Sequence, residues 1–476
     1  MLRVLISTRG SRRRWFARIA NFPCCRSSKG GRRDEDGVGS QRYRGLSGLA
    51  VPGASLPPGE RVEIRAEGLF LNGAPFFPVG IDHAAHWHLS LPEAGEKGFN
   101  LVTTHGLGAD PQSFRADIDD AYANGMYAAA ALTNGVWEDL ERVEQIVLAC
   151  RDAPGLLAWE FEHEPDLRLS GPEHEDTPHA DRPYRMPPED FVPAYELVKR
   201  LDPVHPVRVE LSYGRLRDHQ AYRGVADILS DLCRPVPRLP LVSVAQYSDA
   251  VVEGAAGKPG WMVLQMMSGS GPGGERHPTM TEVRCMTYLA VVHGISGVIY
   301  KAFHYGEWWV TDKPAYWAQW SDLTTELRCL TPYLVAPPAN GRVKAEINEG
   351  SREPGAGGYT ALHYSLRQTE GCYFLIVVNG FDSPVRARFT VPVPASGLAD
   401  RAAVRFENRL VDVEEGVFDD FFAPHAVHLY EIPFTAHLDR ETAQWPRWQR
   451  RAKSSILGRS NNGRASSGTG MTWRPS

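Results

Sequence analysis

Residues 156–166, with the sequence LLAWEFEHEPD, begin as an apolar run and end in a group of acids followed by a proline. Side chains alternate between the two faces of a β-strand, so the apolar residues fall on one face and the acids on the other. The apolar face holds Leu157, Trp159 and Phe161, and the acidic face holds Glu160, Glu162 and Glu164. Burying several acids is costly unless they line a wet or charge-paired site. The stretch therefore predicts the floor of an active site, and the alternative is a helix start or a solvated edge strand.

Apolar strand patterns alternate with helical patterns on both sides of this stretch. We expect strands at 76–81, 98–105, 126–132, 155–162, 206–211, 226–232, 261–267 and 297–303, and helices at 113–124, 139–152, 188–201, 281–293 and 315–330. Eight strands, each followed by a helical or partly helical stretch, match the (β/α)8 TIM barrel, whose active sites lie at the C-terminal ends of the strands. A doubly wound open sheet is the alternative, but it normally brings a glycine-rich phosphate loop, and the sequence contains none.

The chain divides into four predicted segments. A small hairpin over 62–71 opens the barrel segment, 59–336, and short β-rich runs separated by turns predict a small antiparallel β-sandwich over 337–436. Residues 1–58 and 437–476 are basic and rich in Ser and Gly, so we expect them to be disordered. Residues 11–16 resemble a twin-arginine export signal, but the following residues are too few and too polar for its apolar region, which favours a disordered leader or an early start codon.

Composition excludes several classes of partner. A net charge of -5 and a pI near 6.4 give no reason to expect a nucleic acid or an anionic membrane as partner. No apolar run reaches the roughly 18 residues of a membrane span, so we expect a soluble protein. Seven cysteines, odd in number and without metal-type spacing, indicate free thiols rather than a disulfide framework.

Five motifs, in chain order, resemble those of retaining glycoside hydrolases built on (β/α)8 barrels. They are LNGAPFFPVG at 71–80, GFN at 98–100, LAW through EP at 157–165, YELVKRLDPVHP at 195–206, and RHPT through HG at 276–294. The resemblance spans about residues 69–335. It implies an enzyme that cleaves a β-linked sugar in an oligo- or polysaccharide without a cofactor, and such enzymes commonly carry an accessory C-terminal sandwich.

The resemblance assigns roles to residues of strands four and seven. In that family the glutamate before the proline is the general acid/base, which implies this role for Glu164. The preceding residue is usually an asparagine that hydrogen-bonds the sugar 2-hydroxyl, and here it is His163, which can still donate one hydrogen bond. The nucleophilic glutamate of strand seven corresponds to Gln265, whose amide can neither form a glycosyl ester nor act as a base.

A hydrolytic reaction then needs a second carboxylate from another position. The candidates are Asp231 near the end of strand six, Glu210 at the end of strand five, and Glu162. A base about 6.5–9.5 Å from the acid would activate water and give an inverting enzyme. Asp231 and Glu210 could instead pair with Arg234 and Arg208, and we expect Glu160 to form a structural salt bridge inside the barrel.

Other polar and aromatic residues follow the strands and are candidates for contact with a sugar. They are His83, His105, His163, Gln265, Lys301, His304, Tyr305 and Trp308. Aromatic rings after strand eight can stack on a pyranose face or simply pack. The spacing of His83, His86 and His88 lacks the glutamate of metalloproteases, so we predict no metal site.

Three hypotheses follow. The first is a glycoside hydrolase with Glu164 as proton donor and a second carboxylate at an unusual position. The second, favoured by Gln265, is a carbohydrate-binding protein on a degenerate hydrolase barrel without turnover. The third is a metal-dependent hydrolase that uses the histidines after strand one.

Overall fold

The computed structural model describes residues 62–65, 68–82, 91–104, 110–171, 174, 176–268 and 276–435. The predictions for residues 1–58 and 437–476 lie outside these ranges, as do His83, His86, His88 and His105.

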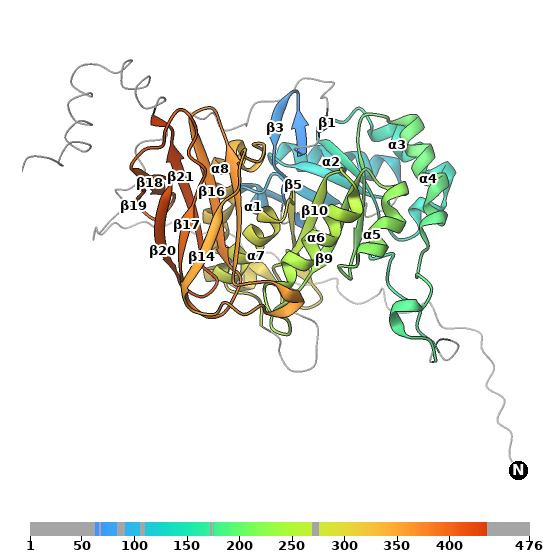
Figure 1. Cartoon of the computed structure of the whole chain (residues 1–476). Coiled ribbons are helices and arrows are strands. Elements are labelled where there is room, and N and C mark those ends of the chain that lie inside the picture. Colours follow the sequence, from blue (N-terminus) through green and yellow to red (C-terminus); the bar gives the residue numbers. More distant parts are fainter. Residues whose placement is uncertain are drawn as a thin grey trace, which may run out of the picture. The chain divides into compact units, whose positions relative to one another are not determined.

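Eight parallel strands form a closed barrel (Figure 1). In order around the barrel they are β4 (Val79–Asp82), β5 (Leu101–Thr104), β6 (Tyr127–Ala131), β7 (Leu156–His163), β8 (Val207–Leu211), β9 (Ile228–Cys233), β10 (Gly260–Gln265) and β11 (Val298–Lys301). Strand β11 pairs in parallel with β4, which closes the barrel. The predicted (β/α)8 barrel is therefore confirmed, and an open doubly wound sheet is excluded.

Helices follow the barrel strands. They are α1 (Leu91–Glu96), α2 (Pro111–Ala123), α3 (Leu140–Cys150), α4 (Pro188–Leu201), α5 (Leu216–Tyr222), α6 (Ser243–Ala255), α7 (Met280–Val292) and α8 (Pro314–Leu334), with short 3₁₀ turns η2 (Val136–Glu138), η4 (His179–Asp181), η5 (Arg223–Val225), η6 (Val310–Asp312) and η7 (Ala356–Gly358). Helix α7 begins at a capping box in which Thr279 and Glu282 each accept a hydrogen bond from the other's backbone N–H. In the described part of the chain, no helix has both the length and the apolar character needed to cross a membrane.

A three-stranded antiparallel sheet covers the N-terminal end of the barrel. It consists of β1 (Val62–Arg65), β2 (Gly68–Leu71) and β3 (Ala74–Phe76), so the predicted hairpin is confirmed. Its Leu69 packs in one buried cluster with interior side chains of the barrel strands, such as Trp261 and Ile299. Because apolar side chains fill the barrel interior at this end, polar side chains inside the barrel gather toward the C-terminal end.

Strand β7 carries two irregularities in its pairing. The register shifts against β6 next to Ala128 and against β8 between Glu160 and His163. Leu157 packs in the interior cluster, whereas Trp159 and Phe161 pack in the outer core with the helices. Trp159 and Phe161 therefore share a face as predicted, whereas Leu157 does not, because the β-bulge opposite Ala128 inserts a residue and reverses the alternation between Leu157 and Trp159.

Two antiparallel sheets follow the barrel, as predicted. One has five strands, β15 (Leu362–Gln368), β16 (Cys372–Asn379), β21 (Val427–Pro433), β18 (Arg401–Val404) and β19 (Arg409–Asp412), and the other has three, β14 (Lys344–Glu349), β17 (Val385–Thr390) and β20 (Val417–Phe422). Their facing side chains form one core that contains Leu375, Phe389, Phe418 and Tyr430.

The five-stranded sheet also packs against the barrel helices. Its Phe374 and Ile376 belong to the same hydrophobic cluster as the helices, and the Phe374 ring stacks on Tyr333 of α8 with centroids 4.3 Å apart. Arg284 of α7 donates from Nη1 to the carbonyl of Val427 at 2.8 Å. The barrel and the C-terminal sheets thus share a continuous core.

Candidate active site

Six ionisable side chains from four barrel strands meet inside the barrel near the C-terminal strand ends. They are Asp82 of β4, Glu160 and His163 of β7, Arg208 and Glu210 of β8, and Lys301 of β11. Arg208 lies 2.6 Å from Glu160 and 2.7 Å from Glu210. Lys301 Nζ lies 3.0 Å from Glu210 and 3.5 Å from Asp82. We call this set the barrel charge network.

The charges of the barrel charge network compensate one another. Burial alone would raise the pKa of Glu210, but Lys301, His163 and Arg208 outweigh it and lower that pKa to about 2. Burial would likewise lower the pKa of His163, but Glu210 and Glu160 raise it to about 9. Its Nε2 lies 2.9 Å from Glu160 Oε1. Three carboxyl groups therefore face three basic groups, and the predicted salt bridges of Glu160 and Glu210 are present.

Three members of the barrel charge network have the ligand types that a metal ion prefers. One atom from each of Glu160, His163 and Glu210 lies within 4.8 Å of the others. Both glutamates are already paired with Arg208, and Glu210 also with Lys301. These cations supply the positive charge that a metal would bring, so the arrangement favours an ion-pair network over a metal centre.

Glu164 follows the network at the C-terminal end of β7. Its N–H donates to the carbonyl of Glu210 at 2.8 Å, and its φ of 51° places it in the left-handed region, which costs a non-glycine residue about 1–2 kcal/mol. Burial alone would lower the pKa of Lys301, but the carboxylates of Glu210, Asp82 and Glu164 raise it. The Glu164 carboxylate, which is only half-buried, forms no ion pair or hydrogen bond with any described residue, so it remains available.

Glu162 differs from the acids of the barrel charge network. Its Oε2 accepts a hydrogen bond from the backbone N–H of Asn134, which follows β6, at 2.9 Å. No basic side chain among the described residues pairs with it, and its side chain is almost buried, with 9% of its surface exposed. It is a carboxylate held by backbone, with no compensating cation in the part of the chain that the structure describes.

Asp231 is completely buried, and both of its hydrogen bonds end on Oδ2, whereas Oδ1 is buried without a hydrogen-bond partner among the described residues. It accepts hydrogen bonds from the Gly214 N–H and from His219 Nε2, both at 2.8 Å. Burial raises its pKa. The alternative partner considered from the sequence, Arg234, is exposed, and the observed partner is His219 of α5.

Gln265 uses its amide to hold backbone. Its Nε2 donates to the carbonyls of Val236 and Met267 at 2.8 and 3.1 Å, and its Oε1 accepts from the Val236 N–H at 2.9 Å. The side chain is 1% exposed. The residue at the end of strand seven is therefore a structural clamp in this chain.

The candidates after strand eight lie on a short hairpin of β12 (His304–Tyr305) and β13 (Trp308–Trp309). All four residues are half-buried. His304 bonds to the Gly306 carbonyl at 2.7 Å and packs on Trp309, with ring centroids 4.0 Å apart. The indole N–H of Trp308 and Nδ1 of His304 are both buried without a hydrogen-bond partner among the described residues, so a rearrangement of this hairpin around a ligand could satisfy either group.

Tyr213, which the sequence reasoning missed, lies on the loop after β8. Its neighbour Ser212 donates from N and Oγ to Asp166, both at 3.2 Å, and Gly214 is held by Asp231. Burial, Asp166 and Glu164 raise the pKa of the Tyr213 hydroxyl, which places it near the acid. In the sequence, the signal for this residue is a tyrosine followed by a glycine just after the strand predicted at 206–211. The φ of Gly214 is 58°, and a Cβ there would lie 2.5 Å from the Tyr247 ring.

Asp166 connects the Glu164 turn to the Tyr213 loop. It is completely buried, and burial together with Asp231 raises its pKa to about 7. Asp166 lies two residues after Glu164 and accepts hydrogen bonds from Ser212, the neighbour of Tyr213. These hydrogen bonds therefore fix the Glu164 turn against the loop that carries Tyr213.

Comparison of this chain with known proteins shows which fold it shares with them. Neither a known protein family nor a curated protein matches the sequence. The fold is similar to that of β-galactosidase from Bacillus circulans sp. alkalophilus, with 8% identity, coverage of 75% of this chain and 99% of that chain, and a TM-score of 0.52. An α-amylase from Anoxybacillus matches more loosely, with 10% identity, coverage of 73% and 89%, and a TM-score of 0.44. The fold that this chain shares with that β-galactosidase is the (β/α)8 barrel, and at such identities the likeness extends to the fold alone.

Proposed function

We propose that this protein is a glycoside hydrolase that cleaves a β-linked sugar, with Glu164 as the proton donor. The observation that carries the proposal is the difference between Glu164 and the acids around it. Glu160, Glu210 and Asp231 are buried and paired, whereas Glu164 is half-buried at the strand end and unpaired among the described residues. A general acid needs a carboxyl group that can reach the glycosidic oxygen.

Glu162 is the second carboxylate in this proposal. Glu210 is 1% exposed and Asp231 is 0% exposed, and each forms an ion pair. Neither carboxylate can therefore reach a water molecule in the barrel mouth without breaking that ion pair. Within the described ranges, Glu162 has a single backbone partner and no cation to neutralise it. As a base that activates water it would give inversion at the anomeric carbon, because retention needs a nucleophile that forms a glycosyl ester.

The sugar contacts in this proposal come from the aromatic residues around Glu164. Tyr213, on its fixed loop, and Trp308, with its unpaired indole N–H, offer stacking surface and hydrogen-bonding groups. His163, Lys301 and Gln265 are engaged in internal interactions. We assign these three to shaping the barrel mouth rather than to direct contact with the sugar.

The hydrogen bonds of Gln265 favour a second function, which is carbohydrate binding without hydrolysis. The Gln265 amide is fixed by three backbone hydrogen bonds at the position to which the sequence resemblance assigns the nucleophile of retaining glycoside hydrolases. A protein that binds a carbohydrate without hydrolysing it would need no carboxylate at that position.

The test uses a panel of methyl and unsubstituted phenyl β-glycosides, whose leaving groups need protonation, with the wild type, Glu164→Gln and Glu162→Gln. General acid–base groups contribute about 10²- to 10⁴-fold, so each variant should lose activity by a factor in that range. Glu189→Gln, a change at an exposed position of α4, is the matched control and should retain full activity. Proton NMR of the first product should show the inverted anomer.

The outcomes separate the two functions. Equal rates for the wild type and Glu164→Gln would remove Glu164 as the proton donor. Sugar binding without hydrolysis by the wild type would favour the binding protein. A retained anomer would exclude Glu162 as a base for water.

A further inference from the structure

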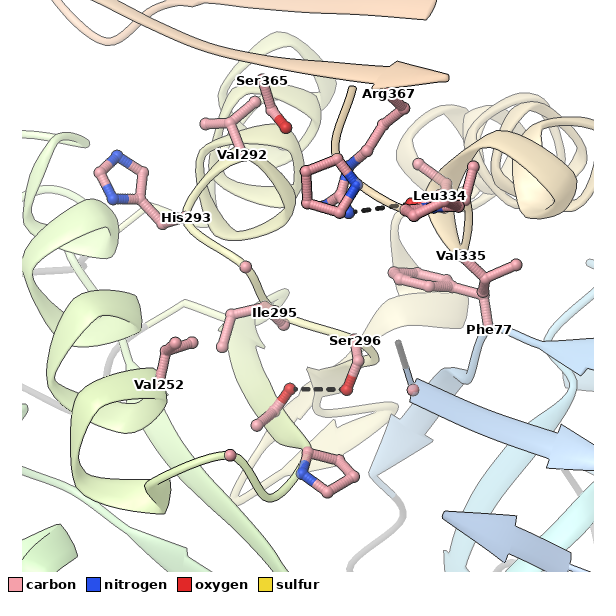
Figure 2. Close-up of a pocket in the computed structure, with 18 of the residues that line it drawn as sticks. Phe77, Val252, Val292, His293, Ile295, Ser296, Leu334, Val335, Ser365 and Arg367 are labelled. Atoms are coloured by element: carbon pink, nitrogen blue, oxygen red, sulfur yellow. Dashed lines mark hydrogen bonds between the residues drawn. The ribbon is translucent and has the colours of Figure 1, made fainter. Parts of the chain in front are cut away.

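A cavity of about 630 Å³ lies at the N-terminal end of the barrel strands, where the barrel meets the C-terminal sheets (Figure 2). Gly260, the first residue of β10, and Ser296, just before β11, line it from the barrel, and Ser365 and Arg367 line it from β15. Its volume falls within the range of small-molecule sites, about 300–1,000 Å³. The cavity is at the opposite end of the strands from Glu164, so it is separate from the candidate active site.

Arg367 is a cation without a counter-ion. Its Nη1 donates to the carbonyl of Ala336 at 3.1 Å, and its Nε is buried without a hydrogen-bond partner. No carboxylate among the described residues forms an ion pair with it, and burial lowers its pKa. A partly buried guanidinium is costly when its charge is unpaired, and it has five N–H donors to satisfy.

A purely structural role accounts for part of this arrangement. Ala336 lies just beyond the end of α8, and a cation near the last carbonyls of a helix is stabilising. This contact uses one nitrogen of the guanidinium and leaves Nε unpaired inside the protein. Capping of α8 therefore explains the position of Arg367, and because Nε is shielded from the cavity as well, a ligand there would meet the guanidinium at Nη1 or Nη2.

The other charged groups of the cavity leave it with positive charge. Lys258 donates to the carbonyls of Arg223 and Ala226, both at 2.7 Å, so it too is bound by neutral groups only. The single acid of the lining, Asp249, is bound by His293 at 2.7 Å and by the Tyr359 hydroxyl. Two cations thus line the cavity without a carboxylate paired to either among the described residues.

The remaining walls are apolar. Val252, Ile295 and Val335 surround the space, with Phe77 on one side (Figure 2). A cavity with apolar walls and a few fixed polar groups is typical of a site for a small organic molecule. We propose that it binds a small organic anion whose carboxylate or phosphate group pairs with Arg367, since a guanidinium binds either group through two parallel N–H donors.

Binding is tested by calorimetry on the full chain with inorganic phosphate, glucose 6-phosphate, glucuronate and uncharged glucose. At least one anion should bind the wild type, and glucose should not. Arg367→Gln should weaken that binding at least tenfold. Arg388→Gln, on an exposed arginine paired with Asp419, is the matched control and should bind as the wild type does.

Further variants keep the test decisive. Ser365→Trp fills the cavity but retains the charge of Arg367, and it should also abolish binding if Arg367→Gln does not fold. Glu164→Gln should bind the anion unchanged, which separates this site from the proposed hydrolase. The preferred anion distinguishes a phosphate from a carboxylate ligand. The inference fails if no anion binds the wild type, or if Arg367→Gln or Ser365→Trp binds equally well.

Discussion

Arg208 is the side chain on which the barrel charge network depends. It is completely buried, it contacts Glu160 and Glu210, and its Nε donates to Ser230 Oγ at 3.0 Å. Such a cation does not add much net stability in comparison with an apolar residue of equal volume, because its own desolvation is costly. Its removal alone, however, takes away the cation shared by two buried carboxylates and leaves Glu160 with His163 and Glu210 with Lys301.

We therefore predict that Arg208→Met destabilises the protein by about 3–5 kcal/mol, the cost of breaking a buried ion pair from one side. Urea unfolding measures the change. Arg388→Met, which breaks an exposed pair with Asp419, should change stability by less than about 1 kcal/mol. If Arg208→Met destabilised the protein by less than about 1 kcal/mol, His163 and Lys301 would be sufficient to compensate the two glutamates.

At the level of residues, the sequence predicts roles better than partners. The expected salt bridge of Glu160 is present because an acid in mid-strand inside a barrel has to be paired. The partner of Asp231 could not be predicted, because His219 comes from the next helix and its approach depends on the packing of α5. The clamp formed by Gln265 needs a backbone loop at Val236 that no local pattern indicates.

At the level of elements, apolar runs bounded by turns were enough to locate the eight barrel strands. Strand faces were less predictable, since the bulges of β7 shift the alternation without any mark in the composition of the strand. Strand β14 could not be located within the predicted sandwich from its sequence, KAEINE. It lies at a sheet edge and is mostly exposed, so it lacks an apolar run.

The loop that carries Tyr213 gives a prediction for pH dependence. The pKa of Asp166 is about 7 in the folded protein and 3.8 ordinarily, so the folded state keeps a proton that the unfolded chain releases. Stability should therefore fall as pH rises from about 4 to 7. Asp166→Asn removes this loss, and its stability relative to the wild type should rise by up to about 1.4 kcal/mol per pH unit in that window.

Urea unfolding of both proteins at pH 5 and pH 7.5 measures this difference. The comparison concerns the slope with pH, because the asparagine also changes the hydrogen bonds to Ser212. Asp119→Asn, at an exposed position of α2, should keep a constant difference from the wild type. If the free energies of unfolding of Asp166→Asn and the wild type differed by the same amount at both pH values, the folded protein would hold this carboxyl ionised.

At the level of the whole molecule, the described barrel and the C-terminal sheets share a core and should unfold together. Phe374 is completely buried between β16 and α8. We predict that Phe374→Ala lowers the stability of both parts by about 3–5 kcal/mol. Calorimetry should show one transition that moves to lower temperature, and Phe421→Ala, at an exposed position of β20, should leave it nearly unchanged. Two separate transitions would contradict the shared core.

The clamp at Gln265 also limits how this chain can change over evolutionary time. Codons for glutamine and glutamate differ by one nucleotide, so a mutation to an acid at this position is readily available. A carboxylate there would face the carbonyl oxygens of Val236 and Met267, which now accept from the amide, and would have no hydrogen to offer them. The loop would have to rearrange before the acid could be tolerated, so a single change of Gln265 to glutamate should be selected against even though one nucleotide suffices for it.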